Sequence, residues 1–164
     1  MAQAPHPPLR LVQALSADLA AHGQVALGGS ALLYALGLTA RVRDWDLVTD
    51  VPAEQVAQLL AARGLPAERR SGDSPKFATA ALFRVDAGNY DIDVLVDFAV
   101  RTTRDTVSIP PRGWRVWNQM MLADPQDWEH AYRLMGRVEK ADLLRDWLVN
   151  DRGPVGGEDW PIRG

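Results

Sequence analysis

The sequence predicts an α+β domain in which a mixed β-sheet of about five strands is flanked by helices, with a helical segment at the C-terminal end. Three observations predict this class. Short apolar runs alternate with amphipathic helical patterns through the first part of the chain. Residues 87–89 carry a hairpin signal between two alternating runs, which indicates an antiparallel pair. After a loop with Pro110 and Pro111, apolar residues return at helical spacing.

The expected helices follow from apolar spacing and from residues that favour helix ends. Apolar residues recur every three or four positions, and glycine follows several of the last turns. Asp124 before Pro125 predicts one N-terminus, and Ser30 predicts another as an N-cap. The expected helices cover residues 8–21, 31–36, 50–63, 124–135 and 137–150.

Short apolar or alternating runs define the expected strands, which cover residues 24–27, 44–49, 67–71, 76–86 and 90–98. The last two flank the hairpin signal and should pair antiparallel. We expect a core formed by residues 1–105, a helical segment at 106–150 packed on that core, and a flexible tail at 151–164. A chain of 164 residues suits one such domain.

Composition excludes several classes of protein. Hydrophobic residues make up 47% of the chain and charged residues 24%, which is typical of a globular domain. There are no cysteines, so disulfides, thiolate zinc sites and cysteine nucleophiles are excluded. A net charge of −3 argues against strong non-specific nucleic-acid binding. No apolar run approaches the roughly 20 residues of a membrane span, and the first residues lack signal-peptide features. We therefore expect a cytoplasmic protein with no membrane partner.

Two Asp-x-Asp pairs are the strongest chemical feature. Asp44 and Asp46 lie on an expected strand, so their carboxylates point to the same face and could share one hard cation. Asp91 and Asp93 form the second pair on another strand. If the two strands are neighbours, one acid of the second pair completes a site of three carboxylates. The alternative is a solvated strand end, because 16 aspartates produce one or two such pairs by chance.

A second feature is the sequence Gly28-Gly29-Ser30 between an expected strand and an expected helix. Glycines let a ligand approach the backbone closely, and a helix N-terminus attracts phosphate. The alternative interpretation is a tight turn with an N-cap serine. Followed by acidic pairs on later strands, the turn indicates a polyphosphate–magnesium site.

These motifs resemble the signature of the DNA polymerase β-like nucleotidyltransferase superfamily. Residues 25–30 read Val-Ala-Leu-Gly-Gly-Ser and residues 43–48 read Arg-Asp-Trp-Asp-Leu-Val, within a match that covers about residues 24–98. Residues 124–148 resemble, more loosely, the helical tail of minimal members such as abortive-infection toxin-type proteins; residues 140–146 there read Lys-Ala-Asp-Leu-Leu-Arg-Asp.

The resemblance implies a nucleotidyltransferase fold and a magnesium- or manganese-dependent transfer of NMP from an NTP, expected to be ATP, to an acceptor hydroxyl. It implies that Asp44, Asp46 and Asp93 are the catalytic metal ligands, with Asp91 as the alternative to Asp93. It further implies that Gly28, Gly29 and Ser30 hold the triphosphate.

Lys76, Arg84 and Arg43 are basic candidates for phosphate contacts, although each is also compatible with an ordinary solvated side chain. The acceptor stays open between a small molecule, an RNA 3′ end and a protein hydroxyl. A different class of function also stays open. The fold would then serve as a non-catalytic regulatory or partner-binding module, for example with an antitoxin in a toxin–antitoxin pair.

Overall fold

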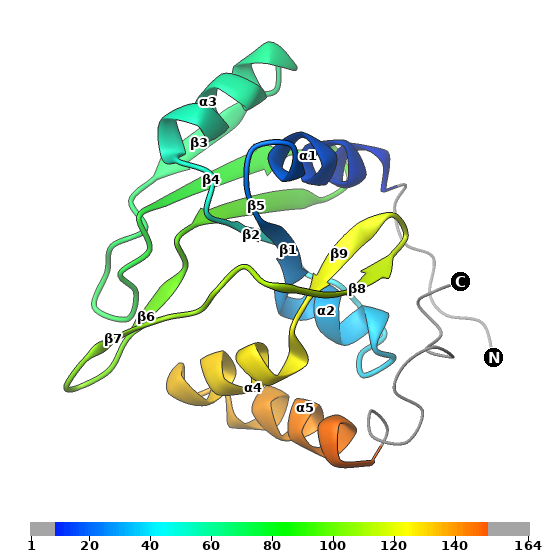
Figure 1. The fold of residues 1–164 in the computed structure, drawn as a ribbon, viewed down its shortest axis with the longest axis vertical. Helices are drawn as coiled ribbons and strands as arrows, with labels where there is room; N and C mark the ends of the chain where they lie inside the picture. The colour runs from blue at the N-terminus through cyan, green and yellow to red at the C-terminus, as the bar shows by residue number, and fades with distance from the viewer. Residues whose placement is uncertain (1–8, 151–164) are drawn as a thin grey trace.

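A computed structural model describes residues 9–150, which form five helices, a seven-stranded sheet and a small two-stranded sheet (Figure 1). The tail expected at residues 151–164 lies outside the described residues. The helices are α1 (Arg10–Ala20), α2 (Gly29–Ala35), α3 (Ala53–Ala62), α4 (Pro125–Leu134) and α5 (Val138–Asn150). The strands are β1 (Val25–Gly28), β2 (Trp45–Thr49), β3 (Ala67–Arg70), β4 (Ala81–Asp86), β5 (Asp91–Val96), β6 (Ala99–Arg101), β7 (Thr106–Ser108), β8 (Gly113–Trp117) and β9 (Met120–Ala123).

The main sheet has the strand order β3-β4-β5-β2-β1-β9-β8, so β2 is its central strand. The sheet is mixed, because β2 pairs parallel with β5 and antiparallel with β1. The hairpin expected between β4 and β5 is antiparallel, as predicted. The α+β class and the mixed sheet are confirmed, with seven strands in place of about five.

The prediction that residues 106–150 form a helical segment is wrong for the part that precedes α4. That part holds β7, β8 and β9, and β9 joins the main sheet beside β1 through the parallel pair Leu27 and Leu122. Trp117 of β8 stacks on Trp45 of β2, with ring centroids 6.2 Å apart. The strands escaped prediction because β8 is rich in arginine and tryptophan, and because β9 pairs with a strand almost a hundred residues earlier.

The strand expected at residues 76–86 is also shorter, since β4 begins at Ala81. The preceding residues turn toward the small sheet instead, where Phe77 makes an isolated antiparallel bridge with Val100 of β6. Asp50, where a helix was expected to begin, precedes α3, which begins at Ala53. Oδ1 of Asp50 accepts a hydrogen bond from the backbone N–H of Gln24 at 2.8 Å, which ties the start of β1 to the end of β2.

The two faces of the central strands have different roles. One face is apolar and nearly inaccessible to solvent, and its residues on β2 and β5 are Trp45, Leu47, Ile92 and Val94. Helices α1 and α3 cover this face, since Leu15 and Leu19 of α1 and Val56 and Leu60 of α3 lie around Val94. In Figure 1 these helices lie above the sheet, and α4 and α5 lie below it. The opposite face carries the acidic residues.

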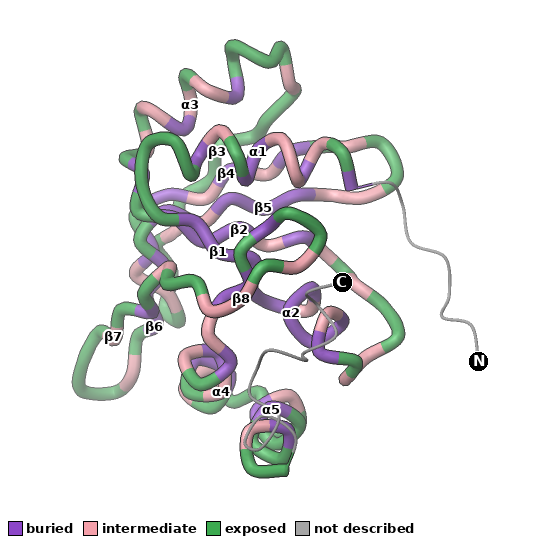
Figure 2. The backbone as a smooth tube through the Cα atoms, turned by 45° about the vertical axis from the view of Figure 1, so that its right-hand side comes forward, coloured by how far each residue is buried: buried purple, intermediate pink, exposed green. Residues whose placement is uncertain are grey.

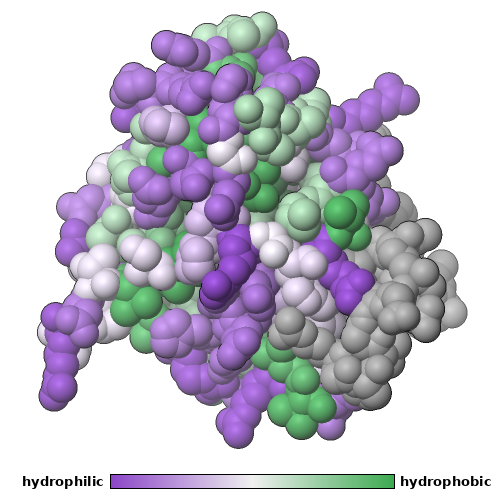
Figure 3. Space-filling view, viewed as in Figure 1, coloured by the Kyte–Doolittle hydropathy of each residue, from purple (hydrophilic) through white to green (hydrophobic). Residues whose placement is uncertain are grey.

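Burial follows this layering. Figure 2 shows buried positions running along the central strands, whereas the β6–β7 hairpin is largely exposed. The face in Figure 3 is mostly hydrophilic, with a hydrophobic area over α5, whose exposed apolar residues are Val138, Leu143 and Val149. Among residues 9–150, no helix is long and apolar enough to cross a membrane.

Candidate active site

The register of three neighbouring strands aligns the glycine turn with two of the acidic residues. Gly28 of β1 pairs with Asp46 of β2, and Asp46 pairs with Asp93 of β5. Paired residues of a sheet point to the same face, so the carboxylates of Asp46 and Asp93 lie side by side. The two acidic strands are therefore neighbours, which is the condition for a site of three carboxylates. The same register puts Asp93, and not Asp91, directly opposite Asp46.

The glycine turn fits closely against Asp46. Gly29 has a φ of +61°, a conformation that glycine adopts at little cost and other residues rarely adopt. A Cβ atom on Gly29 would collide with Oδ2 of Asp46, and one on Gly28 would collide with the indole of Trp128. Both positions therefore require glycine, because a neighbouring side chain lies too close to the backbone to leave room for a Cβ atom. At Gly29 that side chain is the carboxylate of Asp46.

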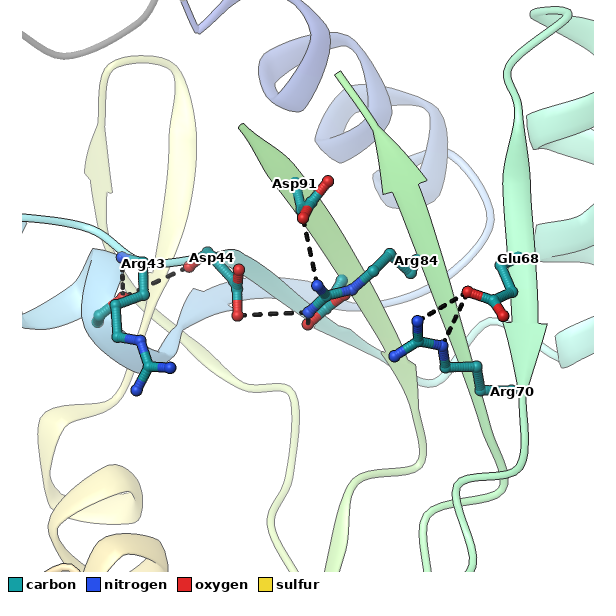
Figure 4. A network of polar contacts seen from close by, with 8 residues as sticks. Arg43, Asp44, Glu68, Arg70, Arg84 and Asp91 are labelled. Carbon is teal, nitrogen blue, oxygen red and sulfur yellow. Dashed lines mark hydrogen bonds and ion pairs between the residues drawn. The ribbon is translucent and has the colours of Figure 1, made fainter. Parts of the chain in front are cut away.

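Ser30 connects this turn to the segment that enters β2. Its Oγ accepts a hydrogen bond from the backbone N–H of Arg43 at 3.0 Å and donates one to the backbone carbonyl of Asp44 at 3.4 Å (Figure 4). Ser30 is not the N-cap of α2, since the helix begins at Gly29 and Gly28 occupies the capping position. Through these two hydrogen bonds the serine instead holds the backbone of Arg43 and Asp44 in place.

Arg84 of β4 is the principal partner of the acidic residues. Its Nε and Nη2 donate to the two oxygens of Asp93 at 2.9 and 2.8 Å. The same Nη2 lies 3.4 Å from Oδ2 of Asp44, and Nη1 lies 3.2 Å from Oδ2 of Asp91 (Figure 4). The hydrogen bond to Asp93 raises the pKa of Arg84 above its ordinary value. Arg84 thus contacts carboxylates, whereas the sequence left it open between a phosphate contact and a solvated side chain.

Asp46 has a different environment from the other acids. The partners of Arg84 are Asp44, Asp91 and Asp93, and Asp46 is not among them. Burial raises the pKa of Asp46 well above its ordinary value, and the neighbouring charges of Asp93 and Asp44 raise it further. Arg84 and Lys140 lower it and only partly offset the increase. Clustered carboxylates of this kind resist ionising together unless a cation compensates them.

The acidic residues are of the type that binds a divalent cation, although their side chains do not converge on one point. Within residues 9–150, no three His, Cys, Asp or Glu side chains are arranged to hold a metal ion as they stand. A single nitrogen, Nη2 of Arg84, nevertheless lies within reach of both Asp44 and Asp93. A positive group therefore already occupies the space between two of the carboxylates. Mg²⁺ prefers oxygen ligands of this type together with substrate phosphates and water.

These residues open onto a cleft of about 450 Å³ between the acidic face of the sheet and the helices α4 and α5. Among the residues that the structure describes, its charged lining apart from Asp44, Asp46 and Asp93 consists of Arg43, Arg137 and Lys140. Burial lowers the pKa of Lys140, as do the charges of Arg137 and Arg43, whereas Asp46 raises it. The cations are therefore close enough to influence one another and the acidic site.

The remaining lining is largely apolar. It includes aromatic and aliphatic side chains from the β3–β4 loop, the central strands and α4, namely Phe77, Leu82, Leu95, Phe98, Trp128, Tyr132 and Met135. Phe98 stacks on Trp128 with ring centroids 5.3 Å apart. Lys140 lies 5.5 Å from the centroid of the Tyr132 ring, a cation–π contact that helps hold it over the cleft. The cleft thus combines a cationic part with an apolar part.

Some site residues were not identifiable from the sequence. Lys140 lies in the run that resembles the tail of minimal superfamily members, but nothing in that run specified a role for it or for Arg137. Conversely, Lys76 is an exposed residue of the β3–β4 loop and does not line the cleft. Asp91, with a side chain 40% exposed, also lies outside the lining.

Comparison with known proteins supports the fold. No family model matches the chain, and no curated protein matches it significantly. TM1012 of Thermotoga maritima, a nucleotidyltransferase by assignment only, matches with a TM-score of 0.62 and 20% identity over 86% of this chain and 92% of that chain. ANT(2″)-Ia, solved in complex with adenylyl-2″-tobramycin, matches with a TM-score of 0.52 and 16% identity over 85% of this chain and 88% of that one. The chain has the nucleotidyltransferase fold of these proteins, as its sequence motifs predict.

Proposed function

We propose that this protein is a magnesium-dependent nucleotidyltransferase that transfers the NMP group of an NTP, expected to be ATP, to an acceptor hydroxyl. The observation that carries the proposal is the row formed by Gly28, Asp46 and Asp93 across β1, β2 and β5, which opens onto a cleft with three cations. The nucleotidyltransferase fold supports the same activity.

The triphosphate would lie between the glycine turn and the cationic part of the cleft. Gly29 and Ser30 of this turn line the cleft beside Asp44 and Asp46. Arg43, Arg137 and Lys140 supply positive charge that offsets the negative charge of the phosphates. These cations come from the segment before β2 and from the α4–α5 region, so the sheet side and the helical side of the cleft would both hold the nucleotide.

The reaction would be an in-line displacement at the α-phosphorus. The acceptor oxygen forms a bond to this phosphorus as the bond to the β-phosphate oxygen breaks, pyrophosphate leaves, and the hydroxyl proton passes to Asp93. Mg²⁺ or Mn²⁺ held by Asp44, Asp46 and Asp93 would supply neutralising charge and make the hydroxyl more acidic. The apolar part of the cleft would hold uncharged groups of the substrates and exclude water.

A transfer assay tests the proposal. The protein is incubated with Mg²⁺ and each of the four α-³²P-labelled NTPs, with total RNA, a proteome extract and aminoglycosides as acceptors. Label should move to one acceptor class, and Asp46→Asn should reduce the rate by about a hundredfold or more, as expected for loss of a metal ligand. Asp146→Asn, at an exposed position of α5, is the matched control and should retain the wild-type rate.

Absence of transfer to every acceptor, together with absence of ATP binding in a calorimetric titration with Mg²⁺, would reject the enzymatic function. A partner that copurifies equally with the wild type and with Asp46→Asn would then favour the non-catalytic module.

A further inference from the structure

Arg84 extends the row of site residues by one strand. Asp46 of β2 pairs with Asp93 of β5, and Asp93 pairs on its other side with Arg84 of β4. The position of the arginine beside the acids is therefore set by the strand register. Its side chain is 29% exposed and that of Asp93 is 12% exposed, so their ion pair is partly shielded from water.

Arg84 contacts the same carboxylate oxygens that a divalent cation would bind. Both oxygens of Asp93 accept hydrogen bonds from the guanidinium, and Nη2 is shared between Asp93 and Asp44. A two-pronged, charge-assisted pair of this kind is stronger than an ordinary hydrogen bond. The hydrogen bonds from Arg84 make both Asp93 oxygens weaker metal ligands, and Nη2 stands in the space between Asp93 and Asp44 that a bridging cation would occupy. Arginine and metal ion therefore compete for the same oxygens.

We infer that Arg84 is a positioning residue that holds Asp44 and Asp93 in the metal-free protein and is displaced from them when a divalent cation binds. The inference rests on the proposed function, because it assigns these carboxylates to a metal. In the free protein Arg84 compensates the acids, which would otherwise repel one another. The free energy of separating the arginine from Asp93 then opposes metal binding, so Arg84 sets the metal affinity of the site.

The inference is tested by the dissociation constant for Mn²⁺, measured from the free-ion signal in electron paramagnetic resonance without any nucleotide. Arg84→Met keeps an unbranched, flexible apolar stem and removes the charge and the hydrogen-bond donors of the arginine. It should bind Mn²⁺ roughly tenfold to a hundredfold more tightly than the wild type, the range expected for releasing a charged hydrogen-bonded pair. Arg70→Met is the matched control, because Arg70 pairs with Glu68 on the adjacent strand β3, away from the acids (Figure 4). It should leave the affinity unchanged.

The variant Arg84→Lys distinguishes direct competition for the Asp93 oxygens from long-range charge repulsion. Lysine keeps the positive charge but cannot bond to both oxygens of Asp93 as the guanidinium does. If direct competition sets the affinity, Arg84→Lys should bind Mn²⁺ several-fold more tightly than the wild type. If only long-range repulsion acted, this variant would bind as the wild type does. Arg84→Lys also carries the test should Arg84→Met fail to fold.

Thermal unfolding gives a second readout. Without metal, Arg84→Met should melt below the wild type because Asp93 loses its partner, and saturating Mn²⁺ should raise its midpoint more than that of the wild type. A purely structural role for Arg84 would lower the midpoint equally with and without metal. Equal Mn²⁺ affinities of the wild type and both Arg84 variants would overturn the inference and leave the proposed function standing. Absence of Mn²⁺ binding in all of them would reject the metal site itself.

Discussion

Gly29 adopts a φ of +61° directly beside Asp46, and a side chain at this position would strike the Asp46 carboxylate. The acidic site therefore depends on the backbone of the turn as well as on the acids. Ser30 adds to this by bonding to the backbone on both sides of the Arg43–Asp44 peptide. Gly29 and Ser30 thus help to place the acidic side chains, although neither residue carries a charge.

Gly29→Ala should consequently disturb the site more than its local strain alone explains. A left-handed conformation costs a non-glycine residue about 1–2 kcal/mol. Gly37→Ala is the matched control, because Gly37 also has a positive φ, +78°, but a Cβ atom there meets nothing within 4 Å. Urea unfolding should show a similar loss of about 1–2 kcal/mol for strain in both variants, with a further loss in Gly29→Ala. Only Gly29→Ala should weaken ATP binding; equal binding by both variants would contradict the role of the close approach.

Asp46 illustrates how a carboxylate placed beside other acids lowers stability. Its raised pKa means that the folded protein holds the proton of Asp46 more tightly than the unfolded chain does. Above the ordinary pKa of 3.8, unfolding therefore releases this proton, and the contribution of Asp46 to the free energy of unfolding falls as pH rises.

Asp46→Asn should therefore stabilise the metal-free protein by about 1 kcal/mol near neutral pH. The gain should be larger at about pH 7.5 than at about pH 4, where folded Asp46 is protonated and uncharged. Chemical denaturation of both proteins at the two pH values measures the difference. A gain that is constant with pH would show that the charge of Asp46 is not its source.

At the scale of elements, the β8–β9 hairpin closes the sheet beside β1. Trp117 pairs with Met120, and the two residues between them, Asn118 and Gln119, have φ values of +47° and +66°. Two-residue hairpin loops with positive φ at both positions are a favoured geometry, because their twist matches that of the strands. Asparagine suits this conformation well and glutamine does not.

Gln119→Gly should therefore stabilise the protein by about 0.5–1 kcal/mol, since glycine adopts a positive φ without strain. Asn118→Gly should change the free energy of unfolding by only a few tenths of a kcal/mol, because asparagine already tolerates the conformation. Thermal melts of the two variants give the comparison. A destabilised Gln119→Gly would indicate that the glutamine side chain makes a stabilising contact that outweighs its backbone strain.

The same elements show what could be predicted from the sequence and what could not. Helices α1, α3, α4 and α5 were expected because their apolar spacing is local, and β2 and β5 were expected as strands that each carry an acidic pair. Whether these two strands are neighbours was left open, and the structure shows that they pair. The place of β9 beside β1 depends on a contact between distant parts of the chain, which no local pattern specifies. The ion pairs of Arg84 and the approach of Lys140 depend on tertiary packing in the same way. The acids and Arg43 could therefore be named from the sequence, whereas the contacts of Arg84 and the approach of Arg137 and Lys140 could not.

At the scale of the whole molecule, α4 and α5 belong to the same core as the sheet. Their buried residues, which are Trp128, Ala131, Tyr132, Ala141, Leu144 and Trp147, form one cluster with those of β1, β2 and β5. Phe98, which follows β5, stacks on Trp128 of α4, so the contact between the layers is aromatic as well as apolar. The helices that form one wall of the cleft are thus part of the folding unit.

Unfolding should accordingly occur in a single cooperative transition. Far-ultraviolet circular dichroism, which follows helices and strands, and tryptophan fluorescence, which follows the packed indoles, should give coincident urea curves. A separate early transition in the helical signal would show that residues 125–150 fold independently of the sheet.

The central position of β2 has a consequence for motion. With β5 on one side and β1 on the other, both edges of the strand that carries Asp46 are hydrogen-bonded to neighbours. Amide protons of such a strand exchange with solvent only when the whole domain opens. Local opening of the hairpins at the edges of the sheet would not change the register between Asp46 and Asp93. The arrangement of the acidic residues would then persist up to the temperature at which the fold itself is lost.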